Sequence, residues 1–147
     1  MPNKRIESEA ERLARYAAKD VTDKMGIKLG ALVQFVGAVE PALVRKARAK
    51  AGPVDDDPRQ KADVILYAPV SAQEITATLK RLRRALKPNG GVWVISAKKN
   101  KGDPHLPDQI LIPLGLAAGL VDNKICSVSE THSAMRFVIP VKDRPLK

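Results

Sequence analysis

The sequence is poor in the residue types that several common functions require. Aromatic side chains make up 3% of the 147 residues, so Leu, Val, Ile and Ala must build the core. Proteins that bind single-stranded nucleic acid without sequence preference usually stack bases on aromatic platforms, and this chain offers few of them. A single cysteine, Cys126, excludes an intramolecular disulfide and is compatible with a reducing cytoplasm.

Long apolar runs are also missing. No stretch approaches the ~20 apolar residues that span a bilayer, and the longest candidate, residues 110–121, contains Pro113. The N-terminus lacks the apolar core of a signal peptide. These absences predict a cytoplasmic protein without membrane insertion. The only histidines, His105 and His132, have no paired ligand spacing, so no metal site is expected.

The sequence does contain an excess of positive charge, and that excess is concentrated. The net charge is +10, and residues 61–102 carry nine basic and only two acidic side chains. Such a region attracts nucleic acid, an anionic membrane surface or an acidic protein, although a solvated helix face or loop has the same composition. The candidate residues for binding an anion or nucleic acid are Arg81, Arg84, Lys98, Lys99 and Lys101.

Apolar runs alternate with helical patterns along the chain. Strands are expected at 31–36, 62–68, 92–95, 120–128 and 133–141. Helices are expected at 7–25, 41–51, 71–86 and 108–118. This order predicts an α/β fold: a three-layer Rossmann-like sandwich whose mostly parallel sheet of about five strands ends in an antiparallel hairpin. Residues 1–25 would form an N-terminal tail and helix, 26–141 the α/β domain and 142–147 a loose C-terminal tail.

Two local signals help to fix these boundaries. Ser71 followed by Glu74 is the pattern of a capping box, which predicts a helix start there. The four residues 88–91, Pro-Asn-Gly-Gly, have the composition of a tight turn, and they lead into the apolar run 92–95. We therefore expect a helix, a turn and a buried strand in succession.

The segment 86–94, Leu-Lys-Pro-Asn-Gly-Gly-Val-Trp-Val, is similar to a turn and strand near the end of class I S-adenosylmethionine-dependent methyltransferases. More closely, segments 86–101, 119–128 and 130–138 resemble a family of small bacterial proteins catalogued as a domain of unknown function. That resemblance covers roughly residues 24–140 and implies a methyltransferase-like fold without an assigned activity. It implies an aromatic residue at the position of His132, so no role of His132 carries over.

The cofactor motif of those methyltransferases is degenerate here. The enzymes carry an acidic residue and a glycine-rich turn around the end of the first strand, whereas here Phe35 stands in place of the acid, Gly37 is retained and Val39 replaces a second glycine. A side chain at Val39 should hinder close approach of a cofactor, and Glu40 should repel its carboxylate. We therefore expect no cofactor, with S-adenosylmethionine as the candidate if one binds. The acidic residues 55–57 could offer a carboxylate to a ribose.

Ligands in open α/β sheets bind beyond the carboxyl ends of the strands, which predicts a crevice lined by Gly37, Tyr67 and Pro69. No catalytic residue is predicted, although either histidine could act as a general base. Cys126 is interpreted as a buried thiol rather than a nucleophile, and Trp93 as a core residue.

Three hypotheses for function follow. The main one is a non-catalytic binding or interaction module, methyltransferase-like in fold, for an anionic partner such as nucleic acid or an acidic protein. The alternative is a divergent S-adenosylmethionine-dependent methyltransferase. The third is a structural homo-oligomer that assembles through the exposed edge of the first strand.

Overall fold

The computed structural model describes residues 20–53 and 59–145. Five strands form one mixed sheet in the order β1-β2-β3-β5-β4. Their bounds are β1 (Val33–Gly37), β2 (Ala62–Ala68), β3 (Leu86–Ala97), β4 (Val121–Ser127) and β5 (His132–Val138). The β1–β2 and β2–β3 pairs are parallel, and β5 is antiparallel to both β3 and β4. The predicted α/β class and the antiparallel closing hairpin are confirmed.

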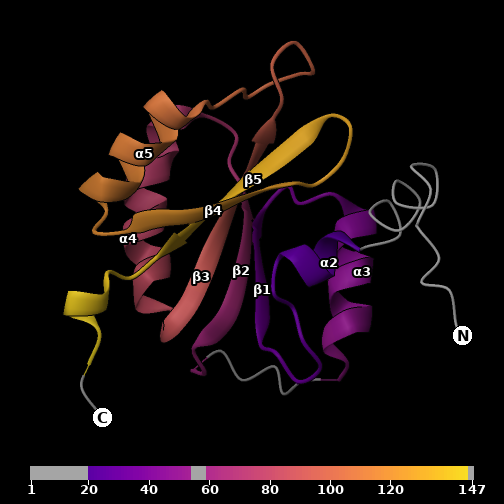
Figure 1. The fold of residues 1–147 in the computed structure, drawn as a ribbon, viewed down its shortest axis with the longest axis vertical. Helices are drawn as coiled ribbons and strands as arrows, with labels where there is room; N and C mark the ends of the chain where they lie inside the picture. The colour runs from indigo at the N-terminus through magenta and orange to yellow at the C-terminus, as the bar shows by residue number, and fades with distance from the viewer. Residues whose placement is uncertain (1–19, 54–58, 146–147) are drawn as a thin grey trace, which may run out of the picture.

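Helices cover both faces of the sheet (Figure 1). On one face lie α2 (Val21–Lys24) and α3 (Pro41–Ala51), and on the other lie α4 (Ile75–Arg84) and α5 (Asp108–Ala117). Two short 3-10 turns complete the described elements: η1 (Ala72–Glu74), before α4, and η2 (Val141–Asp143), after β5. The molecule is therefore a three-layer sandwich, as the alternation of strands and helices predicts.

Strand β2 shows how the sheet divides the core into two. Successive side chains of a strand point to opposite faces. Ile65 and Tyr67 are packed in the cluster under α4 and α5, whereas Val64 and Leu66 belong to the cluster under α2 and α3. Because both faces are covered, β2 is apolar almost throughout, which is the pattern that identifies it in the sequence.

The start of the α4 layer follows the predicted capping box. Glu74 Oε1 accepts the backbone N–H groups of Val70 at 2.6 Å and Ser71 at 3.1 Å, and in return the Ser71 side chain accepts the backbone N–H of Glu74. Ile75 and Leu79 then place the apolar stripe of α4 against the sheet, where both are fully buried. The local signal and the packing therefore agree on where this helix begins.

The predicted turn at residues 88–91 is wrong, because these residues lie within β3. The register of the β2–β3 pair shifts at this point: Ala62 pairs with Leu86, and Val64 pairs with Gly91. A Cβ atom on Gly90 would lie 2.8 Å from the carbonyl oxygen of Ala62, so the two backbones approach more closely than a side chain allows. The glycine pair therefore permits an irregular stretch of a paired strand.

The predicted N-terminal helix lies mostly outside the described residues. Where it is described, the prediction of one helix over 7–25 is wrong, because Asp20 is extended, with ψ of 144°, and caps the start of the separate short helix α2. The Asp20 carboxylate accepts the N–H of Thr22 at 3.1 Å, and Gly26 follows α2 with φ of 76°. At the sheet edge, β1 pairs with β2 alone among the described strands, so assembly through this edge remains a prediction. In the ranges that the structure describes, no helix is long and apolar enough to cross a membrane.

Candidate functional site

A crevice of about 300 Å³ opens where β1, β2 and β3 end, on the face of the sheet that α3 covers. Its walls come from the residues that follow β1 and β2, from the end of β3, and from the loops beyond β3 and β4. Leu43, Ile95 and Val128 supply apolar surface. This is the position at which ligands bind in open α/β sheets, so we take the crevice as the candidate site.

Gly37 makes the tight junction between β1 and the crevice. Its φ of 78° is a conformation that residues with a side chain rarely adopt. A Cβ atom there would lie 2.2 Å from the carbonyl oxygen of Ala68, in the neighbouring strand. The close approach of β1 to β2 therefore requires glycine at position 37, whether or not a ligand binds.

The polar lining of the crevice is acidic. Glu40 at the start of α3 and Asp103 in the loop after β3 both line it, together with His132. No lysine or arginine of the described chain takes part in the lining. A crevice with two carboxylates and no fixed positive charge favours a ligand that is itself positively charged.

His132 is held in one orientation by the hairpin loop. Its Nδ1 atom lies 2.7 Å from the Thr131 hydroxyl, and its backbone N–H donates to Ser129 Oγ at 3.1 Å. The Nε2 atom has no hydrogen-bond partner among the described residues. The crevice therefore contains one oriented imidazole whose second nitrogen is open to a ligand.

The structure separates the three residues predicted to line the crevice. Pro69 lines it, and Gly37 lies at its border, next to the lining residue Ala38. Tyr67 is fully buried on the opposite face of the sheet, where its hydroxyl donates to Glu74 Oε2 at 3.0 Å. Burial raises the pKa of Tyr67 to about 12. The period of two in β2 explains this placement, since Tyr67 shares the face of Ile65.

The five candidate anion-binding residues do not form one surface. Arg81 and Arg84 lie toward the end of α4, which runs back from the carboxyl edge of the sheet toward its amino edge. The three lysines of residues 98–101 follow β3 at the carboxyl edge, and Lys98 Nζ donates to Ser127 Oγ at 2.7 Å. Anion binding by either group remains a prediction.

Trp93 and Cys126 agree with their interpretations from sequence. Trp93 is 1% exposed, and its indole N–H donates to the carbonyl of Met25 at 3.1 Å, so it is a core residue. Cys126 is partly buried, and burial raises the pKa of its thiol, which disfavours the nucleophilic thiolate. In the described ranges no group of three or more His, Cys, Asp or Glu side chains could hold a metal ion.

Of the two carboxylates in the crevice, Glu40 could have been predicted as a site residue from the sequence, whereas Asp103 could not. Asp103 is not among the predicted site residues, and Glu40 is predicted only to obstruct a cofactor. Glu40 carries a usable signal, because it closely follows an apolar strand and precedes a helix-starting proline. Asp103 lies six residues beyond β3, and only the folded loop brings it to the crevice.

No protein-family model matches the sequence, and no curated protein matches it. Solved structures do match. A SAM-dependent methyltransferase from Aquifex aeolicus is similar with a TM-score of 0.57 and 17% identity, over 80% of this chain and 86% of that one. Magnesium protoporphyrin IX methyltransferase from Synechocystis PCC 6803, with bound SAM, gives 0.55 and 11%, over 89% and 82%. Aeropyrum pernix fibrillarin, with natively bound SAM, gives 0.55 and 10%, over 76% and 68%.

These similarities correct two predictions. The non-catalytic binding module is contradicted, because the neighbouring structures are SAM-dependent methyltransferases. The expectation of no cofactor is unsupported, because several neighbours hold SAM or S-adenosylhomocysteine. At these identities the comparisons establish the fold, and the chain has the Rossmann-like fold of class I SAM-dependent methyltransferases.

Proposed function

We propose that this chain is a divergent S-adenosylmethionine-dependent methyltransferase whose cofactor binds in the crevice. The observation that supports the proposal is the acidic crevice beyond the carboxyl ends of β1, β2 and β3. Fold similarity alone would not be sufficient, because one fold hosts many functions. The chemistry of the lining residues supplies the second argument.

The lining fits the charge of the cofactor. S-adenosylmethionine carries a sulfonium and an ammonium against one carboxylate, so its net charge is positive. Glu40 and Asp103 can accept hydrogen bonds from the ammonium group and stabilise the sulfonium. The Glu40 side chain makes no capping hydrogen bond to α3, which leaves its carboxylate available to a ligand. The volume of about 300 Å³ lies at the lower end of the range for ligand sites.

The chain also departs from the pattern of those enzymes, which is why we call it divergent. Val39 lines the crevice where a glycine is usual. Residues 52–61 connect α3 to β2. A further parallel strand between them would need a crossover helix as well, and the connection is too short to hold both. The predicted ribose carboxylate at residues 55–57 lies outside the described residues, and α3 ends at the edge of the sheet opposite the crevice.

Bound S-adenosylmethionine would supply an electrophilic methyl group on its sulfonium. The residues of the chain then have distinct tasks. Glu40 and Asp103 bind and orient the cationic part of the cofactor, and the apolar side chains around them limit access of water. His132 receives at Nε2 the proton that the methyl acceptor loses, because Thr131 holds the opposite ring nitrogen.

Calorimetric titration of the full chain with S-adenosylmethionine and S-adenosylhomocysteine tests the proposal. We expect saturable binding of both and an increase in thermal stability, which amounts to about 2.7 kcal/mol when the ligand is at 100 times its Kd. Neither heat of binding nor a thermal shift with either compound would overturn the proposal.

Matched variants locate the site. Glu40→Gln and Asp103→Asn should each weaken S-adenosylmethionine binding, whereas Glu130→Gln, in the exposed hairpin loop, should not. His132→Asn should leave cofactor affinity unchanged and reduce methyl transfer once an acceptor is found. His105→Asn, at a histidine outside the crevice lining, is its control.

Other predictions from sequence stay predictions beside this proposal. They are membership of the small bacterial family, a cytoplasmic location, a nucleic-acid or acidic-protein partner, and assembly through the β1 edge. The methyltransferase proposal depends on none of them, because it is argued from the crevice.

A further inference from the structure

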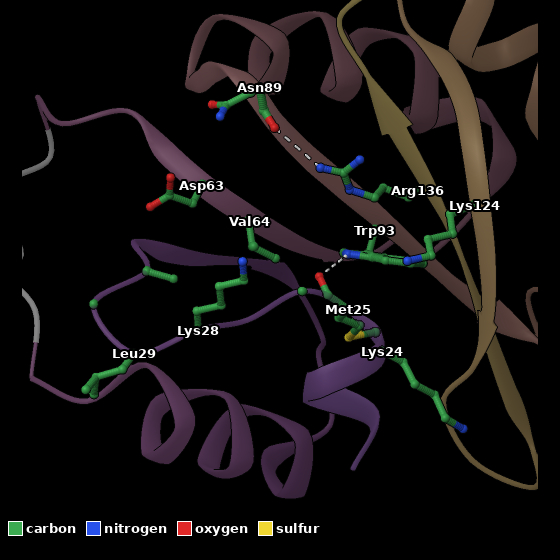
Figure 2. A pocket seen from close by; sticks show the side chains of 13 residues that line it. Lys24, Met25, Lys28, Leu29, Asp63, Val64, Asn89, Trp93, Lys124 and Arg136 are labelled. Atoms are coloured by element: carbon green, nitrogen blue, oxygen red, sulfur yellow. Dashed lines mark hydrogen bonds between the residues drawn. The ribbon is translucent and has the colours of Figure 1, made fainter. Parts of the chain in front are cut away.

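A second and larger hollow, of about 530 Å³, lies on the same face of the sheet as the crevice but near the amino ends of β2 and β3. The lining residues come from α2, from the loop after α2, and from β2, β3, β4 and β5, and in Figure 2 the side chain of Lys24 extends away from the others. Four of the lining residues are basic: Lys24, Lys28, Lys124 and Arg136. We call this site the basic hollow and define it by these four residues.

The positive charge of the basic hollow is not neutralised by the described protein. Asp63 is its one acidic lining residue, and that carboxylate already has partners: Lys87 Nζ at 3.1 Å and the N–H of Leu32 at 2.9 Å. None of the four basic residues has a carboxylate within 4.0 Å in the part of the chain that the structure describes. Four basic residues therefore line one hollow without a counter-ion among the described residues.

Arg136 is a partly buried cation with few hydrogen-bond partners among the described residues. It is only partly exposed, and the one hydrogen bond of its guanidinium to a described residue is a long one, from Nη2 to the carbonyl of Asn89 at 3.4 Å (Figure 2). Burial and then the charge of Arg144 lower the pKa of Arg136. A charge withdrawn from water needs a partner, and most of the N–H groups of Arg136 have none among the described residues.

The sheet leaves space for this guanidinium. Arg136 of β5 is paired with Trp93 of β3, and it lies over Gly91, two residues earlier on the same face. A Cβ atom on Gly91 would be 2.4 Å from Arg136 Nε and 2.8 Å from Cζ. Gly91 therefore allows the guanidinium to lie against the strand, facing the hollow. This requirement gives Gly91 a role that a turn signal does not explain.

We propose that the basic hollow binds phosphate groups, with Arg136 as the anchor and the three lysines as surrounding charges. A guanidinium offers paired donors that match the oxygens of a phosphate, and lysines add flexible point charges. The walls come from six separate elements and enclose a concave space, which favours a compact phosphorylated molecule over an extended strand. Trp93 is almost fully buried, so it offers no exposed face on which a base could stack.

Titration of the full chain with inorganic tripolyphosphate at low salt, followed by calorimetry, tests this proposal. We expect saturable binding that Arg136→Gln weakens by about tenfold to a hundredfold, the range expected for lost charge-assisted hydrogen bonds. No binding, or binding that Arg136→Gln leaves unchanged, would overturn the proposal. Because the probe is not an adenosyl compound, this result is independent of the proposed methyltransferase function.

A second variant protects the test against loss of folding, since Arg136 packs on β3. The triple variant K24Q/K28Q/K124Q removes the surrounding charges without altering the core. Its control, K46Q/K80Q/K142Q, removes the same charge from exposed lysines elsewhere. If K24Q/K28Q/K124Q weakens binding and the control triple variant does not, the result supports phosphate binding at the basic hollow. An equal loss of affinity in both triple variants shows a general charge effect and overturns the proposal.

A final arm distinguishes the source of the phosphates. Single-stranded oligothymidylate of about ten nucleotides spans a typical single-strand site. Tighter binding of the oligonucleotide than of tripolyphosphate, with the same dependence on Arg136, assigns the phosphates to a nucleic-acid backbone. Tighter binding of tripolyphosphate assigns them to a small phosphorylated molecule. Either result supports a phosphate site at Arg136.

Discussion

The crevice and the basic hollow lie on one face of one sheet and have opposite charge. The crevice is lined by Glu40 and Asp103 and by no described cation, whereas four cations and one already paired carboxylate line the hollow. The two sites share the helical layer of α2 and α3 but use opposite ends of the strands. The difference shows that the loops and strand edges, rather than the sheet itself, decide what each end can bind.

The two sites also use glycine differently. At the crevice, Gly37 is fixed by a backbone neighbour, the carbonyl of Ala68, and by its positive φ. At the hollow, Gly91 is required by a side chain, that of Arg136. A backbone cannot move aside without disturbing the sheet, whereas a long side chain can. Replacing the two glycines should therefore have different consequences.

The largest effect is expected for Gly37→Ala. Backbone strain and the clash with Ala68 together should lower the free energy of unfolding by about 3 kcal/mol or more. Gly30→Ala is the matched control, because Gly30 has φ of 86° but no atom within 4 Å of its Cβ position, so only strain of about 1–2 kcal/mol applies. Urea unfolding measures both, and equal losses would show that the clash contributes nothing.

Gly91→Ala should act on binding more than on stability. The new methyl group displaces the Arg136 guanidinium, so affinity for tripolyphosphate should fall by about tenfold while affinity for S-adenosylmethionine is unchanged. The double variant G91A/R136Q should bind no more weakly than R136Q alone, because both changes remove one interaction. Additive losses in calorimetry would contradict this explanation of Gly91.

Tyr67→Phe should lower the free energy of unfolding by about 1 kcal/mol through loss of the hydrogen bond to Glu74. It should not alter either ligand affinity, because Tyr67 faces α4. Its folded pKa of about 12 exceeds the ordinary value of 10. The stabilisation by Tyr67 is thus fully present below pH 10 and is lost as the pH rises toward 12.

Denaturation of the wild type and Tyr67→Phe across this pH range measures the difference. The gap between the two proteins should be constant at neutral pH and should narrow above pH 10. A gap that widens with rising pH would mean that folding lowers the pKa of Tyr67 instead of raising it. A change in S-adenosylmethionine affinity on Tyr67→Phe would contradict the placement of Tyr67 on the face of the sheet opposite the crevice.

The smallest effect expected is that of salt on the crevice. Phosphate binding at the hollow depends on several exposed charges, so its affinity should fall steeply as salt is raised. Binding of S-adenosylmethionine involves two carboxylates and apolar contacts, and its affinity should change much less. Parallel titrations of both ligands at low and at near-physiological salt compare the two sites directly, and equal slopes would remove the electrostatic distinction.

The sequence predicts the sheet better than it predicts the sites. The bounds of β2 and α3 match the expected ranges, because an apolar run and a proline at a helix start are local signals. The Pro-Asn-Gly-Gly segment has equally clear turn chemistry, but the pairs at its two ends, Leu86 with Ala62 and Gly91 with Val64, keep it within β3. Tertiary pairing prevailed over local propensity there.

The site residues are harder to predict, because they come together only through the fold. Tyr67 follows the expected strand, yet the alternation of side chains places it on the face away from the crevice. The hollow joins Lys24 to Arg136, which lie near opposite ends of the described sequence. No local pattern links such residues. The cluster of basic residues in 80–87 is conspicuous in sequence, but in space it is divided between the end of α4 and the start of β3.

Trp93 is the only tryptophan of the chain. Its indole lines the hollow, and its N–H donates to the carbonyl of Met25, 68 residues away in sequence, which ties the segment after α2 to the centre of the sheet (Figure 2). The tryptophan emission of the protein therefore comes from one known place. We expect the wavelength and intensity of Trp93 fluorescence to change when the segment after α2 packs differently on the sheet or when an anion binds in the hollow beside the indole.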